Sequence, residues 1–117
     1  MGKTILIVDD STIMRRMIRT TLQEAGHAVV GEAKNGDEAI ALYQSLKPEL
    51  VTMDITMRGM DGFTAARKIL ALDREARIIF LSNLDETEYG ADALELGAKG
   101  YLNKHRSKEI LELIDHV

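Results

Sequence analysis

Short runs of β-branched and aliphatic residues alternate along the chain with longer stretches in which apolar residues recur every three or four positions. The short runs predict strands at residues 3–8, 28–33, 49–54, 77–82 and 99–103. Between the first two strands, one stripe of a helix is formed by Met14, Met17, Ile18, Thr21, Leu22 and Ala25. The chain therefore predicts a repeated strand–helix order, (βα)5.

Capping residues at one end, and glycine or proline at the other, set the bounds of the predicted helices. Gly97 is well placed to end the fourth helix in a left-handed conformation, and Ser107 can cap the fifth. The helices are expected to run from near Ser11 to Gly26, from Asn35 through Leu46 to the closing Pro48, from Gly62 to Leu72, from Glu86 to Leu96, and from Ser107 toward His116. Each helix follows one strand.

This order implies a doubly wound α/β fold, a five-stranded parallel sheet with right-handed crossovers and helices on both faces. Residues 5–8 and 50–53 are nearly unbroken apolar runs, as expected of central strands buried on both faces. No repeat, low-complexity tract or linker divides the chain, so one domain over residues 1–117 is expected. In such sheets, sites form beyond the carboxyl ends of the strands.

Composition narrows the range of functions. The 117 residues are 45% hydrophobic, which suits one compact core. Lys and Arg number 15 against 19 Asp and Glu, and this net charge of −4 argues against direct nucleic-acid binding. The absence of cysteine excludes disulfides and thiolate chemistry. No apolar stretch approaches the roughly 20 residues of a membrane span, and no signal-peptide pattern is present, so we expect a cytoplasmic protein without membrane insertion.

Acidic residues follow two of the predicted central strands. Asp9 and Asp10 come directly after the first, and Asp54 closes the third. If these strands are neighbours, three carboxylates converge, and two of them about 5 Å apart repel by about 3 kcal/mol at an effective dielectric near 20. The cluster should therefore raise a pKa or recruit a hard cation such as Mg²⁺. Taken alone, Asp10 or Ser11 is better explained as a helix cap.

Two further residues end strands at the same predicted edge of the sheet. Lys104 follows the fifth strand and would place a positive charge there, while Ser82 ends the fourth and would add a hydroxyl donor. A lone lysine is usually solvated and a lone serine usually caps a turn. Together with the acids, however, they supply what phosphoryl transfer to a carboxylate needs: a nucleophile, a metal site and donors for the phosphoryl oxygens.

These residues make the chain resemble the receiver domains of two-component response regulators, of the chemotaxis (CheY-like) type, over essentially its whole length. The similar segments are Leu6-Ile7-Val8-Asp9-Asp10-Ser11, Val51-Thr52-Met53-Asp54-Ile55-Thr56-Met57, Met60-Asp61-Gly62, Ser82, and Gly97-Ala98-Lys99-Gly100-Tyr101-Leu102-Asn103-Lys104. The resemblance implies a flavodoxin-like sheet of strand order 2-1-3-4-5. It also implies a signalling protein that catalyses its own phosphorylation, rather than a metabolic enzyme.

The resemblance further implies a role for each matching residue. Asp54 would accept a phosphoryl group from a histidine kinase or phosphotransfer protein, with Lys104 pairing with that group. Asp10 would bind Mg²⁺ directly, Asp9 mainly through water, and Asp54 and the backbone carbonyl of Thr56 would complete the protein ligands. Ser82 would then turn toward the phosphoryl group, and Tyr101 would follow inward. This movement would remodel the face of the fourth helix, fifth strand and fifth helix, where output partners dock.

The chain departs from the family pattern at several positions. Arg58 and His105 stand where proline is common, and Asn83 replaces a small residue. Thr56 and Leu84 occupy positions that tune dephosphorylation, and because neither is acidic or bears an amide we expect slow loss of the phosphoryl group. The arginines at 15, 16 and 19 and the basic run 104–108 are expected to be solvated helix faces, with Arg15 and Arg19 as candidate kinase contacts.

Other functions compete with the phosphoacceptor switch. A phosphatase with a nucleophilic aspartate usually needs Asp-x-Asp after the first strand, where this chain has Asp9-Asp10-Ser11. A flavin carrier would need a phosphate cradle, which an acidic first loop opposes. The main alternative keeps the fold but not the chemistry: a phosphorylation-independent, receiver-like interaction module.

Overall fold

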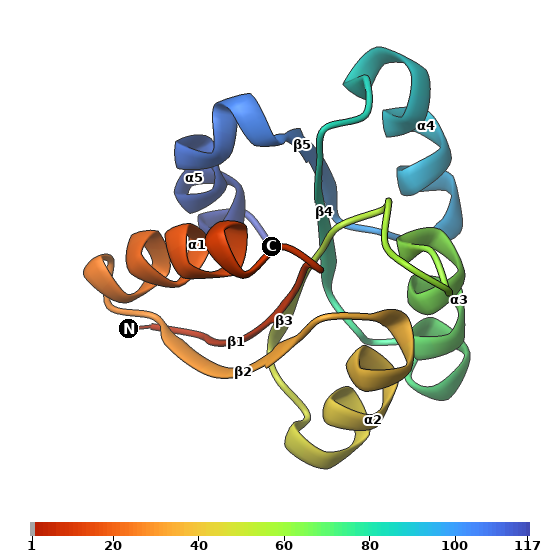
Figure 1. Ribbon diagram of the computed structural model, residues 1–117, viewed down its shortest axis with the longest axis horizontal. Helices are drawn as coiled ribbons and strands as arrows, with labels where there is room; N and C mark the ends of the chain where they lie inside the picture. The colour runs from red at the N-terminus through yellow and green to blue at the C-terminus, as the bar shows by residue number, and fades with distance from the viewer. Residues whose placement is uncertain (1) are drawn as a thin grey trace.

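The computed structural model describes residues 2–117, and its strands form one parallel sheet in the order β2-β1-β3-β4-β5. The predicted order is thereby confirmed (Figure 1). The strands are β1 (Thr4–Val8), β2 (Ala28–Ala33), β3 (Leu50–Met53), β4 (Ile78–Ser82) and β5 (Gly100–Asn103). Their predicted ends are correct to within one residue.

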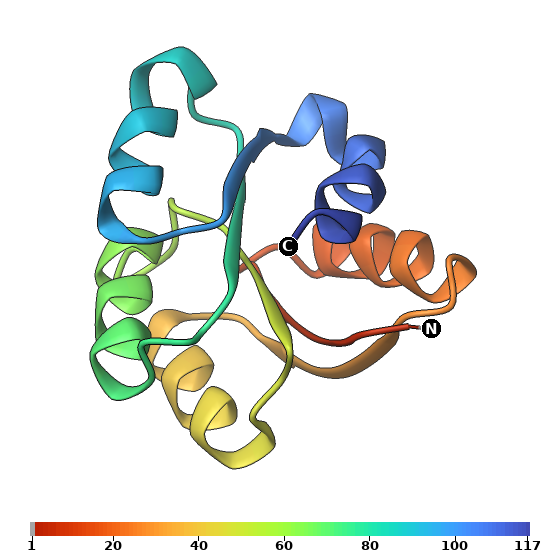
Figure 2. The ribbon, with the colours of Figure 1, turned by 180° about the vertical axis from the view of Figure 1, so that it is seen from behind.

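Helices cover both faces of this sheet, as Figures 1 and 2 show from opposite sides. One face carries α1 and α5, and the other carries α2, α3 and α4. The helices are α1 (Thr12–Glu24), α2 (Gly36–Leu46), α3 (Gly62–Leu72), α4 (Glu86–Leu96) and α5 (Ile110–Asp115), with a 3-10 helix, η1 (Lys104–Glu109), directly before α5. No helix within residues 2–117 is both long and apolar enough to cross a membrane.

Alternation along the strands divides the core into two halves. Ile5 and Ile7 of β1 point to one face and pack with Leu22 of α1 and Ile114 of α5. The intervening Leu6, with Val8, joins the core under the other three helices. Because every second side chain of a strand faces the same side, this fully buried strand needs apolar residues at every position. The unbroken run in the sequence is thus explained.

Local capping fixes where helices begin and end. The hydroxyl of Ser11 accepts a hydrogen bond from the amide of Met14 (3.2 Å), and the side chain of Asn35 accepts one from Glu38 (2.9 Å). Gly97 ends α4 with φ of 116°, the left-handed conformation that was predicted. Because all the strands are parallel, the loops that follow them lie together at the carboxyl edge of the sheet.

The predicted start of the last helix is wrong. Ser107 lies inside η1, and α5 begins only at Ile110. The side chain of Asn103 caps η1 by accepting a hydrogen bond from the amide of His105 (2.9 Å). The chain therefore turns as soon as β5 ends, which holds Lys104 at the sheet edge. The peptide bonds of the described residues are all trans, including the one before His105.

Candidate functional site

Three carboxylates meet at the carboxyl edge of the sheet. Because β1 and β3 pair with Val8 opposite Met53, the residues that follow them, Asp9 and Asp54, become neighbours. Asp9, Asp10 and Asp54 each have a carboxylate oxygen within 4.8 Å of the others. Asp9 and Asp54 are only 1% and 4% exposed, whereas Asp10 faces solvent. The convergence expected from the sequence is present.

Lys104 lies against two of these carboxylates. Its Nζ is 2.8 Å from Oδ2 of Asp9 and 3.3 Å from Oδ2 of Asp54. β5 is separated from β3 by β4, so the long lysine side chain is needed to reach the acids from the first position of η1. One cation thus bridges two buried anions.

Burial decides the electrostatics of this cluster. It raises the pKa of Asp54 to about 6, and the negative charge of Asp9 adds to the rise. The charge of Lys104 and a hydrogen bond from the amide of Ile55 (2.9 Å) oppose it. Burial also disfavours the charged form of Lys104, but its close contact with Asp9 and the negative charges of both acids outweigh this and raise its pKa. Lys104 is thus the one cation that contacts both Asp9 and Asp54 among the ion pairs of residues 2–117.

The donor set fits a hard divalent cation. Oδ2 of Asp9 is buried and contacts Lys104 as an ion pair, but it accepts no well-directed hydrogen bond. This oxygen therefore still has a lone pair available to a metal ion or a hydrogen-bond donor. The three clustered side chains offer only carboxylate oxygens, which Mg²⁺ prefers and Zn²⁺ does not. No histidine joins a metal-compatible cluster within residues 2–117. Thr56 lies exposed in the loop after β3, close in sequence to Asp54.

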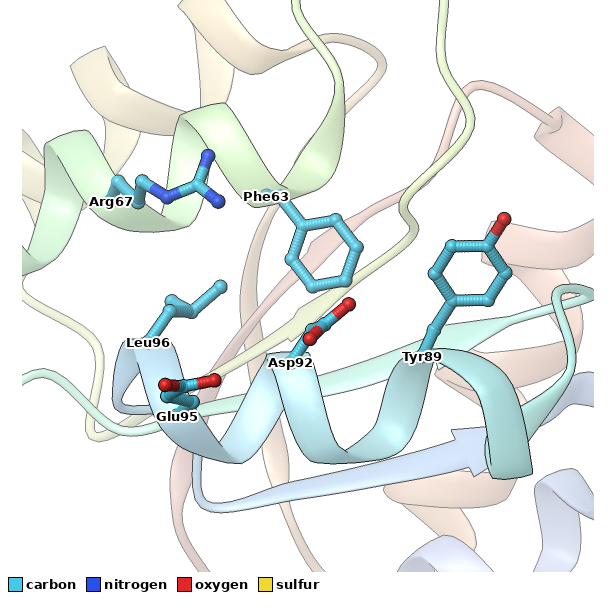
Figure 3. Close-up of a pocket in the computed structure, with 6 residues that line it drawn as sticks. All are labelled: Phe63, Arg67, Tyr89, Asp92, Glu95 and Leu96. Atoms are coloured by element: carbon cyan, nitrogen blue, oxygen red, sulfur yellow. The ribbon is translucent and has the colours of Figure 1, made fainter.

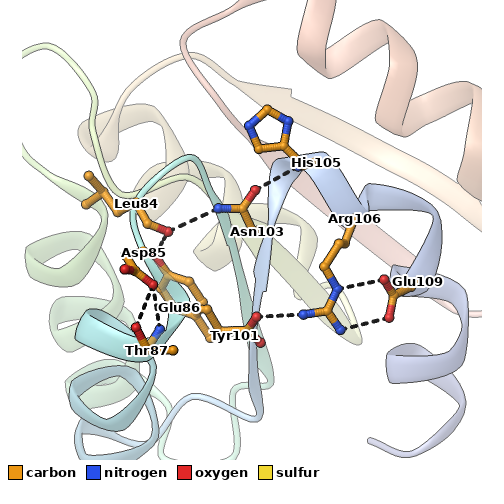
Figure 4. A network of polar contacts seen from close by, with 9 residues as sticks. All are labelled: Leu84, Asp85, Glu86, Thr87, Tyr101, Asn103, His105, Arg106 and Glu109. Carbon is orange, nitrogen blue, oxygen red and sulfur yellow. Dashed lines mark hydrogen bonds and ion pairs between the residues drawn. The ribbon is translucent and has the colours of Figure 1, made fainter.

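Ser82 and Tyr101 are linked through the loop that follows β4. The hydroxyl of Ser82, which is 1% exposed, accepts a hydrogen bond from the amide of Leu84 (3.2 Å). Tyr101 donates its phenol to the carbonyl of Leu84 (3.0 Å), and Asn103 donates to the same oxygen (3.4 Å), as Figure 4 shows. Tyr101 is buried, with its ring centroid 6.4 Å from that of Phe80, and burial raises its pKa. Although β5 is an outer strand of the sheet, the side chain of Tyr101 is therefore buried and not half-exposed.

No sequence pattern indicated the arginine contact that joins α4 to η1. Arg106 pairs with Glu86 at the start of α4 (2.8 Å) and with Glu109 (2.7 Å), as seen in Figure 4. All three side chains are substantially exposed, and such pairs contribute at most about 1 kcal/mol each. They orient the surface beside Tyr101 and add little to stability.

Arg15 contacts the backbone of the carboxylate cluster. The sequence indicated only that Arg15 lies on a basic helix face, and it did not predict this contact. It donates to the backbone carbonyl of Asp9 (2.7 Å) and to the carboxylate of Glu32 on β2 (3.0 Å). Arg19, one helical turn later, also pairs with Glu32 (2.6 Å). Of the three arginines on α1, Arg16 is exposed and makes no ion pair within residues 2–117, whereas these two form structural contacts.

Gly62 is a second residue whose importance only the structure reveals. A Cβ atom there would lie 2.0 Å from the backbone carbonyl oxygen of Asp54. Its amide also donates to the carbonyl of Ile55 (2.7 Å). The first residue of α3 therefore packs directly on the backbone that carries Asp54, and a larger side chain has no room.

A separate hollow of about 380 Å³ lies between α3 and α4 and contains none of the predicted site residues. Figure 3 shows Phe63 and Arg67 of α3 facing Tyr89, Asp92, Glu95 and Leu96 of α4. The rings of Phe63 and Tyr89 are 6.5 Å apart, which is an ordinary packing distance. This hollow reflects packing between the two helices.

Comparison with known proteins agrees with this geometry. A profile of the response regulator receiver domain matches residues 5–115. The chain is similar to the chemotaxis protein CheY of Thermotoga maritima (41% identity, 100% of this chain and 98% of that protein) and of Bacillus subtilis (44%, 98% and 97%). Its structure is similar to a crystal structure of the CheX-CheY-BeF3-Mg²⁺ complex from Borrelia burgdorferi, with a TM-score of 0.92, 31% identity, and coverage of 97% of this chain and 87% of that one.

Proposed function

This chain belongs to the receiver domain family of two-component response regulators, and from that premise we propose that it is a phosphoacceptor switch in which Asp54 receives the phosphoryl group. The observation that supports this most is the cluster of Asp54, Asp9 and Lys104, in which a buried carboxylate has a lysine at 3.3 Å. A carboxylate oxygen can attack phosphorus while a fixed cation offsets charge on the phosphoryl oxygens. We take residues 1–117 to act as a single receiver domain.

Each remaining residue of the site takes a defined part in this proposal. Asp9, Asp10, Asp54 and the carbonyl of Thr56 would hold Mg²⁺, which when bound supplies positive charge for the phosphoryl oxygens. Lys104 would exchange its contact with Asp54 for the phosphoryl group. Ser82 would release the amide of Leu84 and donate its hydroxyl to a phosphoryl oxygen. The positions of Asp9, Asp10, Asp54, Lys104 and Ser82 at one edge of the sheet support this proposal.

The readout would pass through the loop after β4. Leu84 receives hydrogen bonds from Tyr101 and Asn103 and donates its amide to Ser82, so movement of Ser82 would disturb all three contacts. Tyr101 lies on β5, between α4 and α5. We propose that output partners dock on this α4-β5-α5 face and that direct nucleic-acid binding is not part of the function.

The phosphodonor partner is proposed to be a histidine kinase or phosphotransfer protein that docks on α1. Ile13 and Met17 are large apolar side chains on this helix, yet they are 73% and 54% exposed. Reversal of charge at Arg15 or Arg19, the candidate kinase contacts, would also break the hydrogen bond of Arg15 to the Asp9 carbonyl or the ion pair of Arg19 with Glu32. Met17→Glu and Arg16→Glu avoid this, and should slow phosphotransfer from the protein donor while sparing reaction with a small phosphodonor.

A receiver-like module that acts without phosphorylation is not favoured. Such a module would need neither a buried, destabilising carboxylate at position 54 nor a lysine committed to it. Both are present here, at an energetic cost that binding of a cation and a phosphoryl group would offset.

One experiment tests the central proposal. The protein is incubated with Mg²⁺ and a small acyl or amido phosphodonor, and a phosphoryl adduct is sought by mass spectrometry. The adduct should form on the wild type, disappear in Asp54→Asn and persist in Asp115→Asn, an exposed aspartate of α5. No adduct on the wild type, or one that survives in Asp54→Asn, would overturn the proposal.

A further inference from the structure

Thr52 is a buried polar residue that the proposed function does not use. Within residues 2–117, four polar or charged side chains are buried, and the other three, Asp9, Asp54 and Ser82, all belong to the proposed phosphorylation site. Thr52 is 1% exposed and lies on β3, two residues before Asp54. A hydroxyl in the centre of the sheet therefore needs a physical explanation.

The surroundings of Thr52 within the sheet are apolar. Thr52 pairs with Ile7 of β1 on one side and with Ile79 of β4 on the other, and both isoleucines are fully buried. Burial of a hydroxyl that makes no hydrogen bond is unfavourable, so a valine of the same shape would suit this layer better. The hydroxyl therefore points to a polar partner close by.

Asp9 is the partner that the strand register offers. Ile7 faces α1 and α5, and Thr52, which lies directly across from it, points to the same side of the sheet. Asp9 follows Ile7 by two residues, and the pairing reaches this level because the amide of Asp54 donates to the carbonyl of Val8 (2.9 Å). Strands about 4.8 Å apart that rise about 3.3 Å per residue place the Cα atoms of Thr52 and Asp9 about 8 Å apart. Two polar side chains and one water can span this distance.

Both side chains carry an oxygen that lacks a hydrogen bond. Among the buried side-chain atoms of residues 2–117, only Oγ1 of Thr52 and Oδ2 of Asp9 have no hydrogen-bond partner. Oδ1 of Asp9 accepts a hydrogen bond from the amide of Ser11 (2.9 Å), whereas Oδ2 has only the ion-pair contact with Lys104 (2.8 Å). A carboxylate oxygen has two lone pairs, so it can accept from a hydroxyl while it contacts a lysine. The two atoms are thus a donor and an acceptor on neighbouring strands.

We propose that Thr52 is a positioning residue for Asp9. Its hydroxyl donates to Oδ2 of Asp9, through one water or after a change of rotamer, and so sets the direction of the carboxylate toward Mg²⁺. The inference rests on the proposed function, in which Asp9 is one of the ligands, and it adds a residue that this function does not include. With the amide of Ser11 on Oδ1, both oxygens of Asp9 are then directed. Groups that orient a metal ligand from behind strengthen metal binding by about 10- to 100-fold.

The test measures Mg²⁺ affinity in variants of Thr52. Mg²⁺ is titrated into the wild type, Thr52→Val and Thr52→Ser, and the dissociation constant is obtained from the NMR shifts of backbone amides around Asp54. Thr52→Val keeps the shape of the side chain and removes the hydroxyl, so the dissociation constant should rise about tenfold. Thr52→Ser keeps the hydroxyl and should bind Mg²⁺ nearly as tightly as the wild type.

A second measurement separates weaker cation binding from damage to the site. At a Mg²⁺ concentration equal to the wild-type dissociation constant, about half of the wild-type sites and about one in eleven of the Thr52→Val sites are occupied. Phosphorylation of Asp54 by phosphoramidate, followed by mass spectrometry, should then be about fivefold slower in Thr52→Val. At saturating Mg²⁺ the two rates should be equal.

Ile7→Val is the matched control, because Ile7 pairs with Thr52 and is fully buried but carries no polar side-chain atom. It should lower the Tm measured in a chelator, since it removes a buried methylene group, and leave the Mg²⁺ dissociation constant near the wild-type value.

Three results would overturn the positioning role while the phosphoacceptor role stands: a Thr52→Val protein that binds Mg²⁺ as tightly as the wild type, a Thr52→Ser protein that binds as weakly as Thr52→Val, or a slower rate in Thr52→Val that persists at saturating Mg²⁺. A wild-type protein without saturable Mg²⁺ binding would remove the cation site from the proposed function, and this inference would fail with it.

Discussion

Asp54 should destabilise the fold at neutral pH, and its removal should reverse this. Its pKa is about 6 in the folded protein, against an ordinary value of 3.8. The folded state therefore binds more protons than the unfolded state between these two values, so stability falls as pH rises through them. A difference of about two pKa units corresponds to about 3 kcal/mol. Asp54→Asn keeps the shape of the side chain and removes the charge.

Urea or thermal unfolding, followed by circular dichroism in the presence of a chelator, measures this effect. At pH 8, Asp54→Asn should be more stable than the wild type by about 3 kcal/mol, which is about 10 °C in Tm for a domain of this size. The gain should shrink as pH falls from 8 to 4, and below about pH 3, where the wild-type carboxyl is mostly protonated in both states, the two proteins should become equally stable. Asp92→Asn, at an exposed position of α4, serves as the control and should show no such pH-dependent gain.

Two results would refute this reasoning. An Asp54→Asn variant that is less stable than the wild type at pH 8 would mean that the ion pair with Lys104 outweighs burial and the repulsion from Asp9. A gain in stability that is the same at pH 4 and pH 8 would mean that ionisation of Asp54 is not its cause.

Further predictions follow from individual contacts. Gly62→Ala should lower the free energy of unfolding by about 1–3 kcal/mol, because its Cβ would collide with the Asp54 carbonyl. Gly90→Ala, whose Cβ would meet only a Glu86 atom at 3.8 Å, should raise the free energy of unfolding by about 0.5–1 kcal/mol. Equal effects of the two substitutions in urea unfolding would argue against the contact. Tyr43→Phe removes a 2.7 Å hydrogen bond to Asp73, and this bond lowers the pKa of Asp73. The Tm of the variant should therefore fall below that of the wild type by the full amount at neutral pH, and the difference should shrink as pH falls below about 4. A difference in Tm that does not depend on pH would exclude this cause. Mg²⁺ should raise the Tm of the wild type and do so less in Asp9→Asn and Asp10→Asn, and a wild-type Tm that does not respond to Mg²⁺ would contradict the cation site. Thr56→Asn should place a carboxamide two residues after Asp54 and shorten the half-life of the phosphoryl group, measured after donor removal; an unchanged half-life would count against slow loss as a consequence of Thr56.

The order of elements and the location of the site could both be predicted from the amino-acid sequence. Alternating apolar runs and helical stripes gave the five strands, and the acids after β1 and β3 placed the site at the carboxyl edge. This was possible because strand and helix periods, caps and glycine turns are local signals that act over a few residues. Asp9, Asp10 and Asp54 could be grouped because parallel strands bring their carboxyl ends together.

Contacts between residues far apart in the chain could be found only from the folded structure. Gly62 must be glycine because α3 begins against the Asp54 backbone, and Arg15 braces Asp9 because α1 crosses β2 near Glu32. The start of the last helix was mispredicted because Asn103 caps a 3-10 helix, η1, directly after β5. Ser107 lies inside η1, so α5 begins only at Ile110, after Glu109, which makes no side-chain cap. Such choices depend on how elements pack, so no local pattern reveals them. The same holds for the place of Thr52 beside Asp9, which the register of β1 and β3 decides.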